Sequence, residues 1–339
     1  MKVAIAGATG AVGADLIGLL EKRNFPVSEL RLLASARSVG KTLTFKGQEI
    51  KVAELTHNSF KGIDLALFSA GAGRSLEFAP SAVKAGAVVV DNSSAFRMES
   101  SIPLVVPEVN PEEAFKHNGI IANPNCTTIQ MVVALNPLHL AAGIKRIVVS
   151  TYQSVSGTGA MAIEELKTQV HDYVAGNPLK HEIYPYEIAF NVIPHVDVFL
   201  ENGYTKEEMK MVHETRKIMS APNVKVSATC VRVPVFRAHS ESIQIETERK
   251  LSVEEARAIL EKAPGVEVFD RREPGGYPTP KEISGSYLTY VGRLREDIST
   301  ENGLAMWVVA DQLLKGAALN ALQIAELLLT RPKGQGGLA

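Results

Sequence analysis

Residues 1–13 read MKVAIAGATGAVG, a short apolar run followed by three evenly spaced glycines. The apolar run predicts a β-strand, and residues 12–22 have the apolar spacing of a helix. Gly7, Gly10 and Gly13 permit a tight turn and let a pyrophosphate approach the backbone N–H groups at the start of that helix. A glycine-rich turn without a ligand is the alternative, since the spacing departs from the usual G-x-G-x-x-G. The position directly after a first strand favours nucleotide binding.

The remainder of residues 1–125 continues this alternation of strands and helices. Apolar runs predict buried strands and one amphipathic stretch predicts a helix; the strands cover residues 2–6, 30–35, 64–69 and 87–91, and the helix covers 74–85. Residues 41–55 interrupt the order with the polar–apolar alternation of a hairpin. This spacing predicts a parallel sheet covered on both faces, so residues 1–125 are expected to form a dinucleotide-binding domain.

The end of the second predicted strand bears on the choice of cofactor. A domain that selects NAD usually carries an acidic residue there, which holds the ribose 2′-hydroxyl. The segment ASARS, residues 34–38, has no carboxylate. Arg37 can pair with a 2′-phosphate, and the hydroxyl of Ser35 or Ser38 can donate to it. A solvated loop arginine is the alternative, but the missing acid favours NADP.

Residues 126–310 have a different pattern and predict a second domain. Polar–apolar alternation and apolar runs predict strands over residues 144–155, 227–234, 241–246, 287–294 and 303–310. Helices are expected over residues 127–141 and 205–219. Residues 311–329 predict a closing helix, and the segment 311–330 is expected to pack back on the first domain. The second domain therefore resembles an α+β domain built on a mostly antiparallel sheet.

Composition excludes several classes of protein. The 339 residues suggest two domains at about 150 residues each. The chain has 36 Lys and Arg residues and 37 Asp and Glu residues, which gives a net charge of -1. It therefore has no overall positive charge that would attract nucleic acid or an anionic membrane. No apolar stretch reaches the ~20 residues that span a bilayer. Two cysteines are too few for a disulfide framework or a zinc site, so no metal is expected and a cytoplasmic enzyme is favoured.

Cys126 is the candidate nucleophile. The segment NPNCTT, residues 123–128, precedes a predicted helix, so the thiol lies at or near a helix N-terminus, where the dipole and free N–H groups favour a thiolate. A cysteine is more often a small buried hydrophobe, and Cys230 inside TCVRV is expected to be one. Cys126 differs because it occupies a polar turn at the junction between the two domains.

Seven segments together resemble bacterial aspartate-semialdehyde dehydrogenase over nearly the whole chain: GATGAVG, SARS, DNSSAFRM, PNCTT, TYQSVSGTG, CVRVPVFRAHSE and ADQLLKGAA. The resemblance implies an α/β fold, in which a Rossmann-like NADP-binding domain is joined to an α+β catalytic and dimerisation domain. It implies interconversion of L-aspartyl 4-phosphate with L-aspartate 4-semialdehyde and phosphate, using NADPH, in the pathway to lysine, threonine and methionine. A homodimer is implied as well.

The resemblance also implies a role for each matching residue. Cys126 is the acyl-enzyme nucleophile, His239 the acid/base and Gln153 the amide that orients the substrate. The residues implied to bind substrate are Arg232 on the α-carboxylate, Arg97 and Lys210 on phosphate, Glu207 near the amine, and Asn125 beside the nucleophile. The residues implied to bind the cofactor are Gly7, Thr9, Gly10, Ala11, Val12, Gly13, Arg37, Ser38, Ser156, Gly157 and Gln312.

The charge of the implied substrate supports part of this set independently. An acyl phosphate is doubly anionic and the amino-acid carboxylate adds another charge, so the site needs several cations. Arg suits bidentate recognition of a carboxylate and Lys serves as a point charge for phosphate. Glu207 and Lys210 are three apart on a predicted helix and so share a face, although a surface ion pair is the alternative.

The spacing of Arg232 and His239 is harder to reconcile with a shared site. They are seven residues apart, so one straight strand would aim them at opposite faces. Arg237 has the parity of His239, which makes it the rival carboxylate binder on geometry alone. Pro234 argues against an unbroken strand, and a bend or bulge before His239 would restore convergence.

Two other functions are compatible with parts of the sequence. N-acetyl-glutamyl-phosphate reductase shares the glycine-rich start and the Cys/His chemistry, but its nucleophile motif has Gly before Cys and Tyr after it, where this chain has Asn125 and Thr127. A non-catalytic NADP-binding sensor has no need of Cys126, His239 and Gln153 together.

Overall fold

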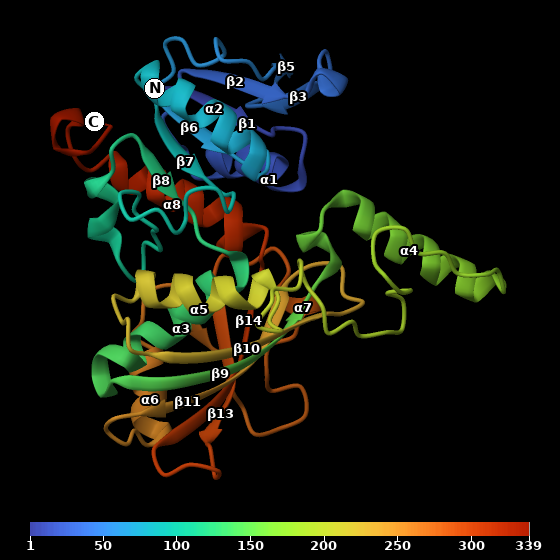
Figure 1. Cartoon of the computed structure of the whole chain (residues 1–339), viewed down its shortest axis with the longest axis vertical. Coiled ribbons are helices and arrows are strands. Elements are labelled where there is room, and N and C mark those ends of the chain that lie inside the picture. The colour runs from blue at the N-terminus through green and yellow to red at the C-terminus, as the bar shows by residue number, and fades with distance from the viewer. Residues whose placement is uncertain (339) are drawn as a thin grey trace. The chain divides into compact units, whose positions relative to one another are not determined.

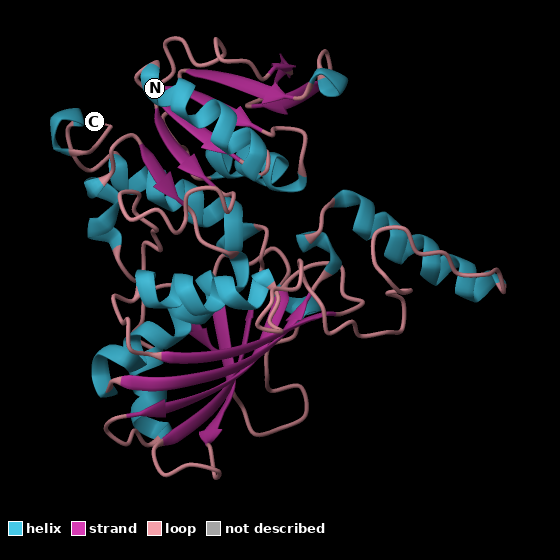
Figure 2. Ribbon diagram, in the orientation of Figure 1, coloured by secondary structure: helices cyan, strands magenta, loops and turns pink. Residues whose placement is uncertain are grey.

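The computed structural model describes residues 1–338, which form two compact units, each built on its own six-stranded sheet (Figure 1). Unit 1 comprises Met1–Asn125 and the segment that starts at Ala317. Unit 2 comprises Cys126–Gly316. Figure 2 shows the helices that accompany each sheet. No helix among residues 1–338 is both long enough and apolar enough to cross a membrane.

The sheet of unit 1 is parallel throughout. Its strands are β1 (Lys2–Ala6), β2 (Glu29–Ala34), β5 (Ala53–Glu54), β6 (Leu65–Phe68), β7 (Val88–Asp91) and β8 (Ile120–Ala122), and they lie in the order β5-β2-β1-β6-β7-β8. Counted in chain order, the strands follow the sequence 3-2-1-4-5-6 of the Rossmann fold. The strand order reverses between β1 and β6, and in such sheets a ligand binds at the carboxyl ends of the strands beside this point.

Helices and a hairpin complete unit 1. The helices are α1 (Ala11–Lys22), α2 (Ala72–Lys84) and α8 (Leu319–Leu328), with 3-10 turns at Ala36–Ser38, Pro111–Lys116 and Lys333–Gln335, and the hairpin is β3 (Thr42–Phe45) with β4 (Gln48–Lys51). α8 packs against α1 and β7. Arg23, just after α1, pairs with Glu326 of α8 at 2.7 Å.

The closing segment differs from the single helix predicted over residues 311–329. A π-turn, Leu314–Ala318, comes first and α8 follows it. The turn belongs partly to unit 2 and the helix to unit 1, so the chain crosses between the units within this segment.

The sheet of unit 2 is mixed and mostly antiparallel, which confirms the fold class. Its strands are β9 (Ile144–Gln153), β10 (Lys225–Arg232), β11 (His239–Thr247), β12 (Val266–Val268), β13 (Thr289–Glu296) and β14 (Gly303–Ala310), in the order β10-β9-β11-β14-β13-β12. β10 is parallel to β9 and β12 to β13, whereas the three inner pairings are antiparallel.

Three helices cover one face of this sheet. They are α3 (Cys126–Ala142), α5 (Lys206–Ile218) and α6 (Val253–Leu260), and α3 contacts the other two as well as the central strands. α3 is apolar on all sides because it lies between the sheet and these helices. Two further helices, α4 (Ala160–Ala175) and α7 (Pro280–Ile283), lie outside this layer, and α4 projects from unit 2 in Figure 1.

Candidate active site

One edge of the unit 2 sheet gathers the ends of four strands. β9 and β10 run parallel and end opposite one another at Gln153 and Arg232. β11 runs antiparallel to β9 and begins at His239, which pairs with Ala310 at the end of β14. The three functional side chains predicted on these strands therefore lie at the same edge.

Arg232 and His239 converge because they stand on different strands. β10 ends at Arg232 and β11 begins at His239, with β9 between the two strands. The chain is interrupted between Arg232 and His239, as Pro234 predicts, so the parity argument that favoured Arg237, which treats both residues as part of one straight strand, does not apply. A Cβ added at Gly157 would lie 3.2 Å from Arg232 Nη1 and 3.3 Å from His239 Nε2, so both groups reach the same point.

The turn after β9 holds both of these side chains. Ser154 is fully buried; its backbone N–H donates to His239 Nδ1 at 3.0 Å, and its carbonyl accepts from Arg232 Nη1 at 2.7 Å. His239 is also fully buried. Burial, and secondly the Arg232 guanidinium, hold the pKa of His239 well below its ordinary value, so the ring is neutral at pH 7.

Cys126 is the first residue of α3 and lies close to Gly316, in the segment that follows β14. A Cβ at Gly316 would lie 2.8 Å from the Cys126 Cβ and 3.3 Å from the Gln312 Cβ, so only glycine allows this approach. Gln312 accepts from the Ala238 backbone N–H at 2.7 Å and donates to Ser156 Oγ. Gln312 thus links the nucleophile's surroundings to the residue before His239.

A chain of polar contacts leads from Gln153 to α5. The Gln153 amide donates to Glu207 at 3.2 Å, and Lys210 pairs with Glu207 at 2.9 Å and with Asp197 at 2.8 Å. Burial opposes the charge on Lys210, but the two carboxylates outweigh it and raise the pKa of the ammonium. Thr205 starts the helix with a capping box, which places Glu207 in its first turn. Glu207 is buried, so this is more than a surface ion pair.

The two candidate arginines have different environments. Arg232 is buried, no carboxylate pairs with it among the described residues, and its Nε has no hydrogen-bond acceptor there. Arg237 pairs with the fully buried Asp311 at 2.6 Å. A buried guanidinium without an anion is costly, so Arg232 is the group prepared to accept one.

Unit 1 carries the predicted cofactor residues of the glycine-rich turn and β2. Gly7 has φ +92°, and a Cβ there would meet the Ser69 carbonyl at 2.2 Å. Gly10 is the N-cap of α1 and no side chain caps that helix, which leaves its first N–H groups for an anion. Thr9 Oγ1 lies 3.4 Å from Ser38 Oγ, so the turn meets the end of β2.

Arg37 follows β2 in the 3-10 turn Ala36–Ser38 and is exposed. No carboxylate pairs with it within residues 1–338. These features fit a dinucleotide with a 2′-phosphate. Ser156, Gly157 and Gln312, also predicted for the cofactor, belong instead to the unit 2 edge.

The remaining predicted substrate residues belong to unit 1. Arg97 is buried and donates to the carbonyls of Asn123 and Asn92 at 3.0 and 2.8 Å. Asn125 is buried and immediately precedes Cys126.

Several residues of the site were not predicted from the sequence. Ser154 lies between two predicted residues, but nothing in TYQSVSGTG indicates that its backbone holds His239. Asp197, thirteen positions before Lys210, gives no sequence signal. Asp311 and Gly316 lie in ADQLLKGAA, where a predicted helix concealed their roles. Within the described chain, no group of His, Cys, Asp and Glu has the arrangement of a metal site.

Cys230 behaves as the sequence predicts. It is fully buried on β10, and burial together with the nearby Glu207 strongly raises the pKa of its thiol. It is therefore an inert thiol and not a second nucleophile.

Glu241 is a buried carboxyl outside the predicted site. It lies on β11 two residues after His239, and its side chain is fully buried. Burial, only partly opposed by the Gln130 amide, raises the pKa of Glu241 well above its ordinary value. The folded state therefore binds this proton more tightly than the unfolded state, and stability falls as the pH rises above the unfolded pKa of about 4.3.

We expect Glu241→Gln to raise the melting temperature at pH 7 and to have little effect near pH 4, because the amide removes the ionisation that burial opposes. Thermal denaturation between pH 4 and 8 measures this difference. Glu267→Gln, at an exposed position on β12, is the matched control. A destabilised Glu241→Gln at pH 7 with a pH dependence like that of the unmodified chain contradicts a protonated Glu241.

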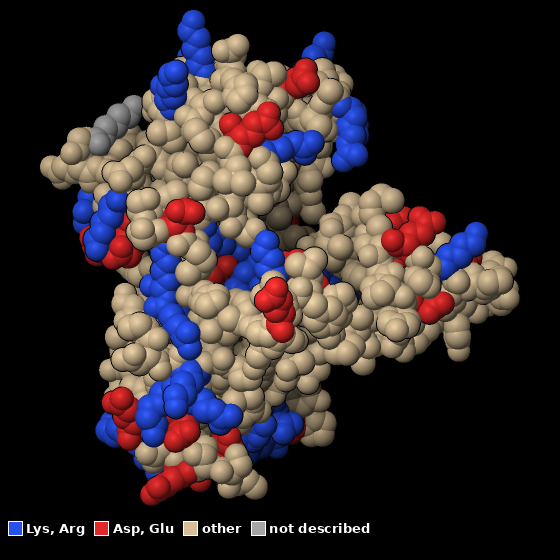
Figure 3. Space-filling model, in the orientation of Figure 1, with Lys and Arg blue, Asp and Glu red and all other residues tan. Residues whose placement is uncertain are grey.

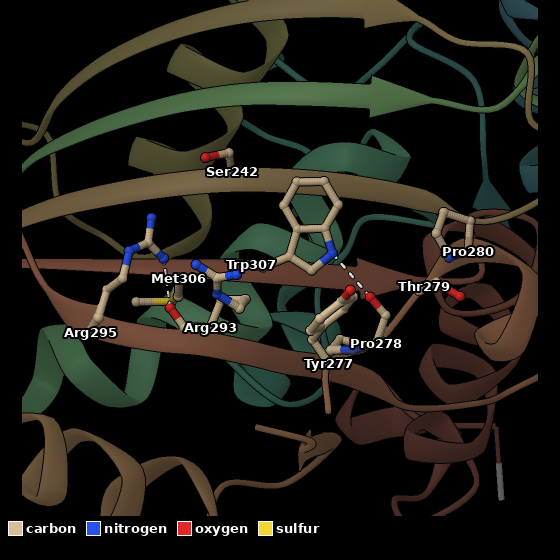
Figure 4. A pocket seen from close by; sticks show the side chains of 9 residues that line it. All are labelled: Ser242, Tyr277, Pro278, Thr279, Pro280, Arg293, Arg295, Met306 and Trp307. Atoms are coloured by element: carbon tan, nitrogen blue, oxygen red, sulfur yellow. Dashed lines mark hydrogen bonds between the residues drawn. The ribbon is translucent and has the colours of Figure 1, made fainter. Parts of the chain in front are cut away.

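A separate pocket of about 320 Å³ lies on the face of the unit 2 sheet that α3, α5 and α6 do not cover (Figure 4). Ser242 points away from the face that Glu241 occupies, because neighbouring strand residues alternate. Ser242 pairs with Trp307, whose Nε1 donates to the Pro278 carbonyl at 3.1 Å. Tyr277, Arg293 and Arg295 also line the pocket. None of the predicted site residues does so.

Comparison with known proteins agrees with this two-unit arrangement. Residues 2–117 match the NAD-binding domain of semialdehyde dehydrogenases, and residues 135–315 match their dimerisation domain. The aspartate-semialdehyde dehydrogenase of Aquifex aeolicus is 60% identical over 332 residues, which cover 97% of this chain and 98% of the relative.

Solved structures of such enzymes share the fold. Aspartate-semialdehyde dehydrogenase II from Vibrio cholerae, complexed with ASA, has a TM-score of 0.94 and 50% identity, with 97% of this chain and 98% of that chain covered. The enzyme of Candida albicans with NADP has a TM-score of 0.76 and 27% identity, with 100% and 99% covered. The identities of 60% and 50% over 97% of this chain confirm the resemblance to aspartate-semialdehyde dehydrogenase. They exclude N-acetyl-glutamyl-phosphate reductase and a non-catalytic sensor. The chain belongs to the aspartate-semialdehyde dehydrogenases, which are oxidoreductases of amino-acid biosynthesis.

Proposed function

We propose that the chain interconverts L-aspartyl 4-phosphate and L-aspartate 4-semialdehyde with NADPH through a thioester on Cys126. The observation that carries this proposal is the edge of the unit 2 sheet. It gathers a thiol at a helix N-terminus, a neutral imidazole and a buried arginine that lacks an anion. These are the groups that acyl transfer from an anionic substrate needs.

The chain's own residues divide the work as follows. The Cys126 thiolate attacks the acyl carbonyl and displaces phosphate, whose charge Arg97 and Lys210 stabilise. Arg232 holds the α-carboxylate in a bidentate pair. His239 is the acid/base, which protonates the developing alkoxide or thiolate as the aldehyde leaves. Bound NADPH supplies the hydride that reduces the thioester.

The polar contacts between Gln153 and α5 are proposed to bind the substrate's amine and to orient its carbonyl. Glu207 lies in the first turn of α5 and already holds Lys210, so its carboxylate offers a negative charge to an ammonium group. Gln153, which donates to Glu207, orients the substrate through its amide. Asn125 immediately precedes Cys126 in the sequence and is the last of the proposed substrate-binding residues.

The activity is tested by mixing the protein with NADP, phosphate and aspartate semialdehyde and following the absorbance of reduced cofactor. We expect formation of NADPH that depends on all three components. Omission of phosphate is the control, because the acyl-enzyme then has no acceptor other than water. Absence of NADPH formation in the complete mixture would refute the proposed reaction.

We assign NADP as the cofactor on the environment of β2. Its end lacks an acidic residue, and Arg37 and Ser38 follow it, with Thr9 of the glycine-rich turn near Ser38. The Candida albicans relative was solved with NADP, which supports the same choice here.

We expect NADP to exceed NAD in kcat/KM by roughly tenfold to a hundredfold. Charge-assisted hydrogen bonds to the 2′-phosphate are worth about 1.5–3 kcal/mol, at ~1.4 kcal/mol for each tenfold change. Arg37→Ala should erase most of this margin and leave the NAD kinetics nearly unchanged, and Ser35→Asp should repel the phosphate. Lys22→Ala, at the other end of α1, is the control. Equal kcat/KM values for the two cofactors in the unmodified protein would make Arg37 an ordinary solvated residue.

We propose a homodimer formed through the sheet face opposite α3. Tyr152 on this face is 37% exposed, and its ring packs at a tilt against Trp307 with ring centroids 5.3 Å apart. The helices α3, α5 and α6 leave this face uncovered, and it belongs to the matched dimerisation domain. The arm that contains α4 also exposes Met161, Val174 and Phe190, and its surface in Figure 3 is largely uncharged. Because Cys126 must stay reduced to act, we further assign the enzyme to the cytoplasm.

We expect Tyr152→Asp to shift the protein from dimer to monomer, because symmetry buries two new carboxylates in one interface. Sedimentation equilibrium measures the change. Leu140→Asp, an equally drastic change at an exposed position on α3, should leave the dimer intact. A dimer that both substitutions leave unchanged would place the interface elsewhere.

A further inference from the structure

The long segment between α4 and α5, residues 176–205, contacts Arg232 in two ways. Ile193 and Arg232 form a backbone pair, in which the N–H of each residue donates to the carbonyl of the other, at 2.9 and 2.8 Å. Tyr184, in the same segment, lies with its ring facing the guanidinium, and Arg232 Cζ is 5.9 Å from the ring centroid. One segment therefore contacts both the backbone and the side chain of Arg232.

Tyr184 is also anchored to the turn after β9. Its hydroxyl donates to Thr158 Oγ1 at 2.9 Å and lies 3.5 Å from the Val155 carbonyl. Ser154, whose carbonyl accepts from Arg232, is the first residue of this turn. The ring and the guanidinium that it faces are therefore held by the same turn.

Contacts with α4 fix the backbone on which Tyr184 stands. The Glu165 carboxylate accepts from the backbone N–H groups of Glu182 and Ile183, both at 2.7 Å, directly before Tyr184. Tyr184 also packs against an apolar cluster that α4, the turn after β9 and this segment build together, consisting of Val155, Ala162, Leu166, Ile188, Ala189 and Ile193. The position of the ring is thus set by the packing of the whole segment.

An aromatic ring stabilises a guanidinium differently from a carboxylate. The ring face attracts the cation, but it offers no oxygen that competes with an incoming anion. Arg237 shows the other arrangement, because its charge is already paired with Asp311. Burial raises the pKa of the Tyr184 phenol above its ordinary value, and the Arg232 charge only partly opposes this shift, so the hydroxyl stays neutral. Tyr184 therefore stabilises Arg232 without neutralising it.

We propose that Tyr184 is a positioning residue for the substrate's carboxylate: its ring holds the Arg232 guanidinium in place and leaves the positive charge available. This inference rests on the proposed function, because it takes the α-carboxylate of the substrate as the partner of Arg232. It extends the site to a segment between α4 and α5 in which the sequence predicts no functional residue.

Tyr184→Leu and Tyr184→Phe separate the ring from the hydroxyl. We expect Tyr184→Leu to raise the KM for aspartate semialdehyde roughly 5-fold to 30-fold, because a cation–π contact shielded from water is lost. The KM values for phosphate and NADP should change by less than about twofold, since Arg232 binds neither. Tyr184→Phe keeps the ring and should stay within about threefold of the unmodified KM.

Tyr186→Leu is the matched control, because it makes the same change two positions further on, at an exposed tyrosine. It should leave all three KM values unchanged. An unchanged KM for aspartate semialdehyde in Tyr184→Leu overturns the proposal. So does a parallel rise in all three KM values, which marks damage to the fold, or an equal effect of Leu and Phe, which assigns the role to the hydroxyl.

Fluorinated phenylalanines introduced at position 184 test the cation–π contact at nearly constant ring size. Each fluorine withdraws electron density from the ring face and so weakens its attraction for a cation. We expect the KM for aspartate semialdehyde to rise as fluorines are added, while the KM for phosphate stays constant. A KM for the semialdehyde that does not depend on fluorination would show that the ring acts by shape alone, against the proposal.

Phenylglyoxal labelling of Arg232, followed by mass spectrometry of its peptide, tests the contact without turnover. Arg232 is buried, so we expect slow labelling in the unmodified protein, in Tyr184→Phe and in Tyr186→Leu, and severalfold faster labelling in Tyr184→Leu. Equal labelling of all four proteins contradicts a ring that holds the guanidinium. If the unmodified protein forms no NADPH but the labelling follows the ring, the proposed function fails and Tyr184 still positions Arg232.

Discussion

Cys126→Ala is expected to lower turnover by on the order of 10⁴-fold or more, because no other group can form the thioester. The fold and NADP binding should persist, since Cys126 is only partly buried at the first position of α3 and alanine is smaller than cysteine. Cys126→Ser should be nearly as poor, because a hydroxyl at neutral pH is a far weaker nucleophile than a thiolate. Steady-state NADPH formation and NADP titration measure these two properties separately.

Cys230→Ala is the matched control for this substitution. Cys230 is buried with a raised thiol pKa, so its loss can reduce stability but should leave the chemistry intact. Trapping with radiolabelled or isotopically labelled substrate should place the acyl group on the peptide that contains Cys126. Near-normal turnover of Cys126→Ala would end the covalent mechanism.

The sequence predicts the elements of the sheet well because their signals are local. The strand expected over residues 303–310 is β14 within the same bounds, and the glycine-rich turn does lie between β1 and α1. Apolar runs and glycine positions depend on neighbouring residues, so they can be interpreted without knowledge of the tertiary structure. The order of the unit 2 strands has no such local signal.

The convergence of Arg232 and His239 could not be predicted from local sequence patterns. Parity along one strand assumes that both residues belong to it, but β9, from much earlier in the chain, lies between their two strands. The pairing of Lys210 with Asp197 and the contact of Ser154 with His239 depend in the same way on long-range packing. Side-chain chemistry indicates which residues are reactive, whereas topology decides which of them meet.

The closing segment also differs from its prediction. Residues 311–329 have a continuous helical pattern, so a single helix was expected there. In the structure, Asp311 accepts from the backbone N–H groups of Leu313 and Leu314, and the π-turn follows. That geometry lets Gly316 approach Cys126, so a local departure from the helix serves the site.

Arg232→Lys is expected to lower kcat/KM by about 2–4 kcal/mol, or roughly 30-fold to 1,000-fold, because a bidentate fork on a desolvated carboxylate becomes a point charge. The structure adds a second reason. Arg232 already gives one N–H to the Ser154 carbonyl, and a lysine cannot hold that carbonyl and both carboxylate oxygens in the same plane. The loss should appear as a raised KM together with a lowered kcat.

Arg237→Lys is the comparison that gives this prediction its meaning. Arg237 is paired with Asp311, and a lysine can retain that ion pair, so the effect on kcat/KM should be mild. Both variants change guanidinium to ammonium within six positions of the chain, so they differ in environment and not in chemistry. The ranking is therefore a direct test of strand topology at the site. If Arg237→Lys proved the more damaging, the substrate carboxylate would be held by the arginine that parity alone selects, and Arg232 would serve only to position Ser154.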